Sequence, residues 1–154
     1  MATTGLDREA IYAALLARLQ TVSGLLTVSR RLPAVVPPGI AEQPCAYVPV
    51  GKEVPQYVSR MPLRWTLHLT VLVFARTDDP SQAPSSILAP LVKGIETALQ
   101  WQPGEAPVSP GAATTLGVAG VLHCTLGPVE YGEGTLDGQG VAVIPLEIVA
   151  VSPG

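Results

Sequence analysis

Four side chains of this sequence belong to types that bind metal ions or act as nucleophiles: Cys45, His68, His123 and Cys124. Cysteine and histidine ligate zinc when they occur in paired motifs such as CxxC or HxxxH. No such pair is present, and the adjacent His123 and Cys124 would point to opposite faces of a strand. We therefore predict no metal site and no bound cofactor. We expect both cysteines to be buried as small apolar side chains, with a disulfide between them as the alternative.

Three other patterns could indicate catalysis or phosphate binding. The glycines of residues 132–140 lack the GxGxxG spacing and precede a strand, so they predict turns. Asp78 and Asp79 precede an expected helix, whose dipole they complement. Ser85 and Ser86 lack a nucleophile-elbow motif. Because no nucleophile, base and orienting group come together, the sequence favours a structural or binding protein over an enzyme.

Composition points to a protein that is covered by partners. Of the 154 residues, 47% are hydrophobic and only 14% are charged, against about 25% charged residues in an average domain. A chain of this length forms one domain with one core, which is too small to hide so much apolar surface. The net charge of −3 excludes a broadly basic surface for nucleic acid.

The sequence contains no pattern for export or for membrane insertion. Residues 1–24 carry charges throughout, in place of the basic start and apolar block of a signal peptide. No window of eighteen residues is apolar enough for a transmembrane helix. We therefore expect synthesis in the cytoplasm and no membrane partner.

Residues 64–76 predict the long strand that organises the fold. Apolar and polar side chains alternate from Trp65 to Thr70, which is typical of a half-buried strand. Beyond Thr70 both faces become apolar, with Leu72 and Phe74 on the second face. We expect a helix to cover one face of this end and a further element, for which another subunit is one candidate, to cover the other.

Two amphipathic helices are expected. The first covers residues 7–21, with Asp7 as the N-cap and Gly24 after its end. The second covers residues 86–101, with Ser86 as the cap and Pro90 in its first turn. Its apolar stripe and its polar side follow helical spacing. The stripe comprises Leu88, Leu91, Val92, Ile95 and Leu99, and the polar side comprises Lys93, Glu96 and Gln100.

The remaining segments predict short strands and loops. Residues 25–32, 45–50, 118–126 and 141–151 read as strands, and Pro145 suggests a bulge or an edge position in the last one. Residues 33–44, 52–62, 102–117 and 131–140 read as irregular connections, and Asp137-Gly138 is a strong hairpin signal. The predicted fold is therefore α+β: a mixed or antiparallel sheet with both helices on one face, extended loops and a C-terminal β-hairpin.

This order of elements resembles the tail terminator (tail completion) proteins of long-tailed bacteriophages. The resemblance extends over nearly all of residues 1–154, as a single domain. It is carried by the helix of residues 8–16, by Pro-Cys-Ala-Tyr-Val at 44–48, by the strand at 65–74, by Ile-Glu-Thr-Ala-Leu at 95–99, and by the closing strand at 141–151. The 102–117 loop is longer than this family leads us to expect.

The resemblance implies a structural virion protein without catalysis or cofactor. It implies a hexameric ring at the tail–neck junction, which caps the head-proximal end of the tail tube and terminates tail assembly. Its partners would be the other subunits of the homo-hexamer, the tail tube protein and the head-completion or stopper protein. Genomic DNA would pass through the lumen without specific binding.

Two alternatives stand beside this hypothesis. One is another neck or head–tail connector protein, or the cap of a phage-derived contractile injection system. The other, of a different class, is a small cytoplasmic enzyme or ligand-binding domain.

Two polar segments are the predicted contact sites, because loops that a rigid scaffold presents are common binding surfaces. In the first, Lys52, Glu53, Tyr57 and Arg60 give a mixed-charge aromatic surface suited to a protein partner. In the second, Glu130, Glu133 and Asp137 form an acidic loop that is expected to face the lumen and repel DNA.

Overall fold

The computed structural model describes residues 5–32, 39–49, 51–105, 111, 113–133 and 138–152. The helices are α1 (Arg8–Gln20), the 3₁₀ helix η1 (Ile40–Glu42) and α2 (Pro84–Ala98). The strands are β1 (Thr27–Ser29), β2 (Cys45–Tyr47), β3 (Lys52–Gln56), β4 (Arg64–Arg76), β5 (Val121–Leu126), β6 (Glu130–Glu133) and β7 (Gln139–Val151). None of the described helices is long and apolar enough to cross a membrane.

Two long antiparallel strands, β4 and β7, run the length of the molecule and pair from Arg64↔Val151 to Arg76↔Gln139. Each has 13 residues and therefore spans about 44 Å. Shorter strands flank the two halves of this ribbon. At one end β2 pairs with β4 and β6 with β7, and β1 adds a parallel edge beside β2. At the other end β3 pairs with β4 and β5 with β7.

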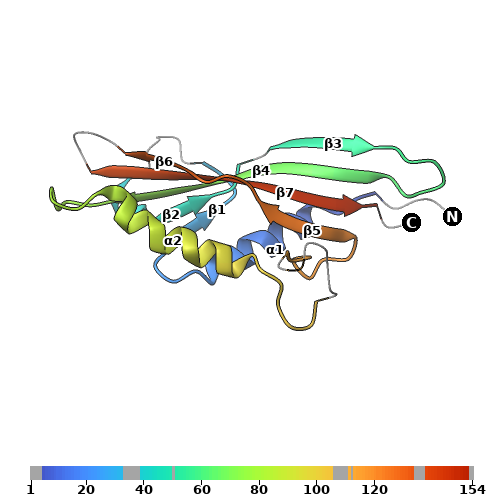
Figure 1. The fold of residues 1–154 in the computed structure, drawn as a ribbon, viewed down its shortest axis with the longest axis horizontal. Coiled ribbons are helices and arrows are strands. Elements are labelled where there is room, and N and C mark those ends of the chain that lie inside the picture. Colours follow the sequence, from blue (N-terminus) through green and yellow to red (C-terminus); the bar gives the residue numbers. More distant parts are fainter. Residues whose placement is uncertain are drawn as a thin grey trace.

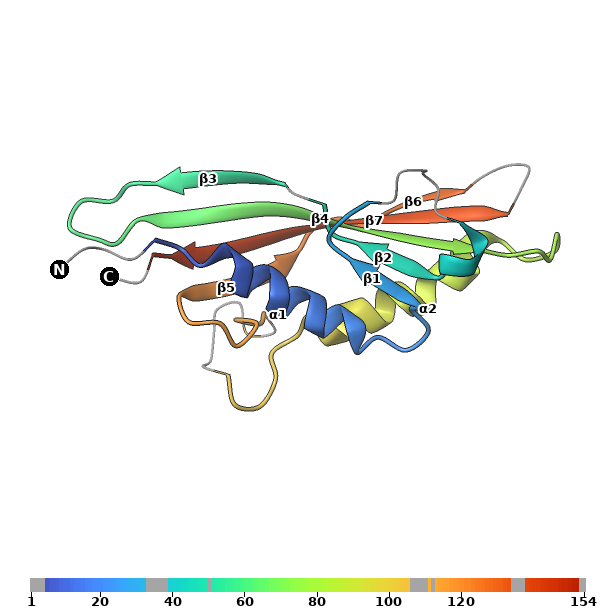
Figure 2. The ribbon, with the colours of Figure 1, turned by 180° about the vertical axis from the view of Figure 1, so that it is seen from behind.

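Both α-helices lie on one face of the sheet, as the sequence predicted (Figures 1 and 2). We call this the helix face. The alternating side chains of β4 from Leu67 to Val73 are buried on it, together with the apolar stripes of the helices. The N-cap of α1 is also as predicted, because the Asp7 carboxylate accepts a hydrogen bond from the backbone N–H of Ala10 at 3.1 Å.

The second helix starts two residues earlier than expected and ends earlier. Pro84 occupies its first turn, where a proline N–H is not needed, and Ala83 precedes it without a side-chain cap. Ser86 is not the cap: its hydroxyl donates to the carbonyl of Ala83 inside the first turn, at 2.6 Å. Pro90 consequently lies within the helix. The predicted stripe is buried, and its polar side is exposed.

The opposite face is covered by the chain itself at the β2 end. Cys45, Tyr47 and Phe74 are buried there, and Leu32 and Leu72 pack against them. The rings of Tyr47 and Phe74 meet edge-on, with centroids 6.1 Å apart, an arrangement favoured by aromatic quadrupoles. The doubly apolar end of β4 is therefore buried within one subunit.

Residues 52–62 were predicted as a loop, and this was wrong for the first part. Lys52–Gln56 form the edge strand β3, which pairs with residues 64–68 of β4. Gly51 allows the two backbones to approach, since a Cβ there would collide with the carbonyl of His68. An edge strand tolerates proline and exposed polar side chains. Because these residues are also typical of loops, the sequence pattern did not indicate a strand here.

The C-terminal hairpin is present, with different bounds. Residues 130–133, which the sequence placed partly in a loop, form β6 and pair with residues 140–143 of β7. The pairing of Glu133 with Gly140 makes the connection longer than the two-residue turn suggested by Asp137-Gly138. Gly138 has a φ of +69°, which favours glycine. Asp137 lies outside the described residues.

Pro145 lies in a central strand, where neither the predicted bulge nor an edge position is found. It pairs with Thr70 of β4, and its carbonyl accepts the N–H of Gly127 at 2.8 Å. The N–H and C=O of one strand residue point to the same side, so the side without an N–H faces away from β4. That side is the gap where β5 ends and β6 begins, and no bond to β4 is lost.

Candidate interaction surface

The tip of the β3–β4 hairpin, which comprises residues 54–61, is the most exposed apolar region of the described chain. Exposed fractions are 37% for Val54, 82% for Tyr57, 42% for Val58 and 57% for Met61. These are four of the eight large hydrophobic side chains that are exposed in the described residues. A cluster of apolar side chains exposed on one protrusion is typical of a protein-contact surface.

Arg60 stands at the centre of this tip. It is exposed and adopts a φ of +64°, a left-handed conformation that is uncommon for arginine. It has no acidic partner among the described residues. The tip therefore presents a tyrosine, a methionine and an unpaired guanidinium, which are residue types enriched in protein interfaces.

The four predicted contact residues divide into two groups. Tyr57 and Arg60 share the tip, whereas Lys52 and Glu53 lie at the far end of β3 on opposite faces. Glu53 is held by Arg8 of α1, whose Nε lies 2.5 Å from its carboxylate. The Arg8 guanidinium also stacks over Trp65, 4.7 Å from the ring centroid. Glu53 thus ties the hairpin to α1 and is not available as an independent contact.

The face opposite the helices is uncovered along the β3–β5 half of the sheet (Figures 1 and 2). The sheet registers align Lys52, His68, Glu147 and Thr125 in one row across the four strands. The first three of these side chains are exposed. The row is a polar surface with alternating charge, in contrast to the apolar cluster at the other end of the same face.

The predicted acidic loop is mostly a strand. Glu130 and Glu133 are the end residues of β6, and Glu130 is exposed. Asp137 and the side chain of Glu133 lie outside what the structure describes. The lumen-facing role of these three acids stays a prediction.

The candidate metal ligands are spread over the sheet. Cys45 and Cys124 are free thiols buried on opposite faces. Burial raises the pKa of both thiols. The pKa of Cys124 rises to about 12, although the positive charge of Arg18 lowers it in part. His68 is exposed. His123 of β5 pairs with Val149 of β7, next to the row that contains His68 and Glu147. Among the described residues no three His, Cys, Asp or Glu side chains group together.

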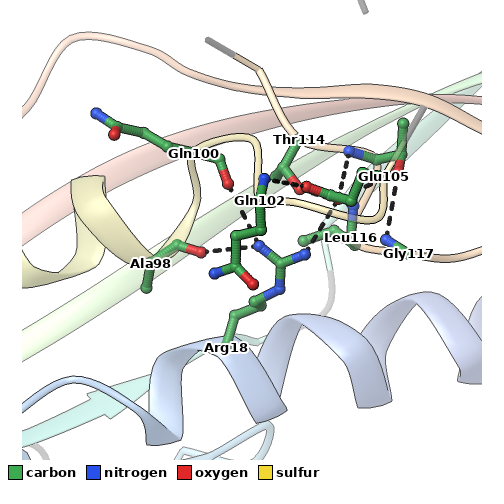
Figure 3. A network of polar contacts seen from close by, with 9 residues as sticks. Arg18, Ala98, Gln100, Gln102, Glu105, Thr114, Leu116 and Gly117 are labelled. Atoms are coloured by element: carbon green, nitrogen blue, oxygen red, sulfur yellow. Dashed lines mark hydrogen bonds and ion pairs between the residues drawn. The ribbon is translucent and has the colours of Figure 1, made fainter. Parts of the chain in front are cut away.

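Sequence reasoning missed a polar network that joins α1 to residues 98–105 and 114–117 (Figure 3). Arg18 of α1 reaches the carboxylate of Glu105 at 3.1 Å and the carbonyl of Ala98 at 3.2 Å. The exposed fractions of the Arg18 and Glu105 side chains are 13% and 6%. Glu105 also accepts the hydroxyl of Thr114 and the backbone N–H of Gln102. This pair fixes the ends of the 102–117 loop against α1.

The same contacts set the charge of Glu105. Burial on its own raises the pKa of this carboxyl. Hydrogen bonds from Thr114, Gln102 and Thr115 and the charge of Arg18 outweigh burial and lower the pKa from 4.5 to about 2. The carboxylate is therefore ionised at neutral pH, and its negative charge is matched within the network. The arrangement is a structural clamp between α1 and the residues on either side of the loop.

Comparison with known proteins identifies a structural relative by fold. No protein-family model matches the chain, and no curated protein sequence matches it. The fold is similar to that of a chain in the virion of a native gene transfer agent (GTA) particle, with a TM-score of 0.51. The alignment covers 95% of each chain at 12% sequence identity. A likeness at this identity establishes a common fold.

Proposed function

We propose that this chain is a structural virion protein of the tail terminator type. In this proposal six copies form a ring that caps the head-proximal end of a tail tube, terminates tail assembly and joins the tail to head or neck proteins. The observation that carries the proposal is the fold similarity to a chain of the GTA virion over 95% of each chain. An alignment over 95% of the chain is not confined to a common supersecondary motif.

The surfaces of the described chain support a role in assembly. The β3–β4 tip exposes apolar side chains and an unpaired arginine, and one half of the sheet has an uncovered face. The buried charges of Arg18 and Glu105 are matched to each other and to neighbouring hydrogen-bond donors. A closed ring reuses one heterologous interface at every subunit contact, so a single pair of complementary surfaces is sufficient.

The proposed place at the head-proximal end of the tail tube determines the partners of the chain. The chain would act as a single domain in a homo-hexamer, between the tail tube protein and a head-completion or stopper protein, at the tail–neck junction of the virion. Tyr57 and Arg60 are the proposed protein contacts, with Lys52 at the base of the hairpin and Glu53 positioning it through Arg8. Glu130, Glu133 and Asp137 would line the lumen and repel the genomic DNA that passes through. No catalysis and no cofactor are part of this role.

Deletion of the gene in the strain that produces the particles tests the proposal. Loss of a terminator is expected to give overlong tails without heads in electron micrographs, and expression of the intact chain is expected to restore normal particles. Tails of normal length that lack heads would indicate a neck connector instead. Normal, complete particles from the deletion strain would contradict a role in the virion.

A further inference from the structure

A groove lies between the C-terminal end of α2 and β5. Its floor consists of Leu99, Ala113, Cys124 and Leu126, and Glu96 lies on its rim. Its volume is about 270 Å³. Leu99, Ala113 and Cys124 are buried, whereas Glu96 is exposed and has no basic partner among the described residues. The groove thus combines an apolar floor with one free negative charge.

The β3–β4 tip has the complementary chemistry. Tyr57 and Met61 are its exposed apolar side chains, and Arg60 is its unpaired positive charge. In one subunit the tip projects from the end of the sheet (Figure 1), whereas the groove is lined by residues at the C-terminal end of α2 and in β5. The β4–β3 ribbon is paired in register to Arg64, so the tip cannot fold back into its own groove.

We propose that the β3–β4 tip of one copy docks into the α2–β5 groove of the next copy. This inference rests on the proposed ring and names its interface. The Tyr57 ring covers Leu99 and Leu126, and Arg60 pairs with Glu96 at the rim. Aromatic and arginine side chains that enter a pocket carry much of the binding energy of protein interfaces, and the matched charges fix orientation.

The geometry favours a closed assembly. Tip and groove are different surfaces, so each copy offers one of each and the contact is heterologous. Repetition of such a contact gives a ring when the rotation between copies closes. A pairing of two identical tips would give only a dimer and would leave the grooves empty.

Cross-linking tests the contact. Arg60→Cys and Glu96→Cys proteins are mixed and treated with a short bismaleimide, because an arginine–glutamate pair separates the Cα atoms too far for a direct disulfide. The native cysteines are buried, and each variant alone is the background control. In the mixture we expect a cross-link between residue 60 of one copy and residue 96 of another. In ring-bearing particles that contain the double variant, we expect a ladder of linked subunits. Rings that contain no 60–96 cross-link would overturn the inference and leave the proposed function standing.

Charge exchange gives an independent test. Arg60→Glu and Glu96→Arg are each expected to lower ring formation at least about tenfold, and the two substitutions together in one chain are expected to restore it. Lys93→Glu, on the same helix as Glu96, is the matched control that should form rings. Equal loss in this control, or no rescue in the double variant, would contradict the pairing. Failure of the unaltered chain to form any ring at tube ends would contradict the proposed function itself.

Discussion

The two halves of the β4–β7 ribbon have the same two strands and opposite surroundings. At the β2–β6 end, α2 covers one face, and the cluster of Cys45, Tyr47 and Phe74 is buried on the other. At the β3–β5 end, α1 covers one face, while the other presents the exposed row from Lys52 to Glu147. The first end is buried within one subunit, and the second projects a tip with exposed Tyr57 and Met61.

Because of this difference, substitutions in the two halves are expected to affect different properties: the free energy of unfolding in one half and assembly in the other. The clustered side chains of the first half are buried against other parts of the same chain, so substitutions of them are expected to change the free energy of unfolding. Side chains of the projecting tip have few neighbours, so substitutions there are expected to change assembly only. The Arg18–Glu105 clamp lies between these cases, because it holds the loop that borders the α2–β5 groove.

The largest effect on stability is expected for Leu91→Ala. Leu91 is 5% exposed on the inner side of α2, so its truncation removes apolar burial and leaves a cavity, at a cost of about 2–5 kcal/mol. Urea unfolding followed by circular dichroism measures this free energy. Leu26→Ala, at a side chain that is 69% exposed, is the control. A change near zero for Leu91→Ala would remove α2 from the core.

A smaller loss is expected for Glu105→Gln, because the charged hydrogen bonds with Arg18 and Thr114 are replaced by neutral ones. Hydrogen bonds to charged groups contribute roughly 1.5–3 kcal/mol, and a loss of about 2 kcal/mol is expected at pH 7. Unfolding of both proteins in urea gives the difference. Glu96→Gln, an exposed acid of α2, is the matched control and should leave stability unchanged.

The pH dependence sharpens this prediction. The pKa of Glu105 is lowered from 4.5 to about 2 in the folded chain, so its charge stabilises the fold above the unfolded pKa. That stabilisation is lost as the pH falls from about 4.5 towards about 2. The difference between the unaltered chain and Glu105→Gln should therefore shrink over this range. A difference that stays constant down to pH 2 would show that the charge of Glu105 does not stabilise the fold.

Sequence patterns predicted the elements whose evidence is local. The strand at residues 64–76 was found with its bounds, because apolar and polar residues alternate from Trp65 to Thr70, an apolar run continues beyond Thr70, and Asp78-Asp79-Pro80 ends the pattern. The first helix was found through the Asp7 cap and its apolar stripe. The start of α2 was missed because Pro84 at the first turn and Ser86 as a cap are both common helix starts, and the sequence does not decide between them.

Features that depend on distant partners could not be predicted. β3 is a strand because it pairs with β4, and its own composition of Lys, Glu, Pro and Gln suggests a loop. The Arg18–Glu105 pair joins residues 87 positions apart, and no motif marks either of them. For the contact sites, the polar and aromatic composition of residues 52–62 predicted a contact surface, on what was expected to be a loop. It could not show that Glu53 is bound to Arg8 or that the groove exists.

Stability changes within about 0.5 kcal/mol are expected for Tyr57→Ala and Arg60→Ala, because both side chains are exposed. Assembly should fail nevertheless, with overlong or headless tails in the particles that carry either variant. Thermal unfolding of the purified variants and electron microscopy of the particles measure the two properties. If both variants support normal tail completion, the tip is not a contact surface.

The smallest effect is expected for His68→Ala. The side chain is exposed on the sheet face that carries the Lys52–Glu147 row, and we predict no metal or catalytic role for it or for Cys45, His123 and Cys124. Stability and particle assembly should both stay unchanged. Metal analysis of protein purified without chelator is the companion measurement, and stoichiometric zinc or iron would contradict the prediction.

The most direct measurement is an electron cryomicroscopy reconstruction of the head-proximal end of the tail in intact particles. Our account predicts a layer of six copies at the tube end, in which the β4–β7 ribbon fits the density and each β3–β4 tip reaches the α2–β5 groove of the neighbouring copy. A tube end that joins the neck without any six-fold layer of this chain would contradict the account.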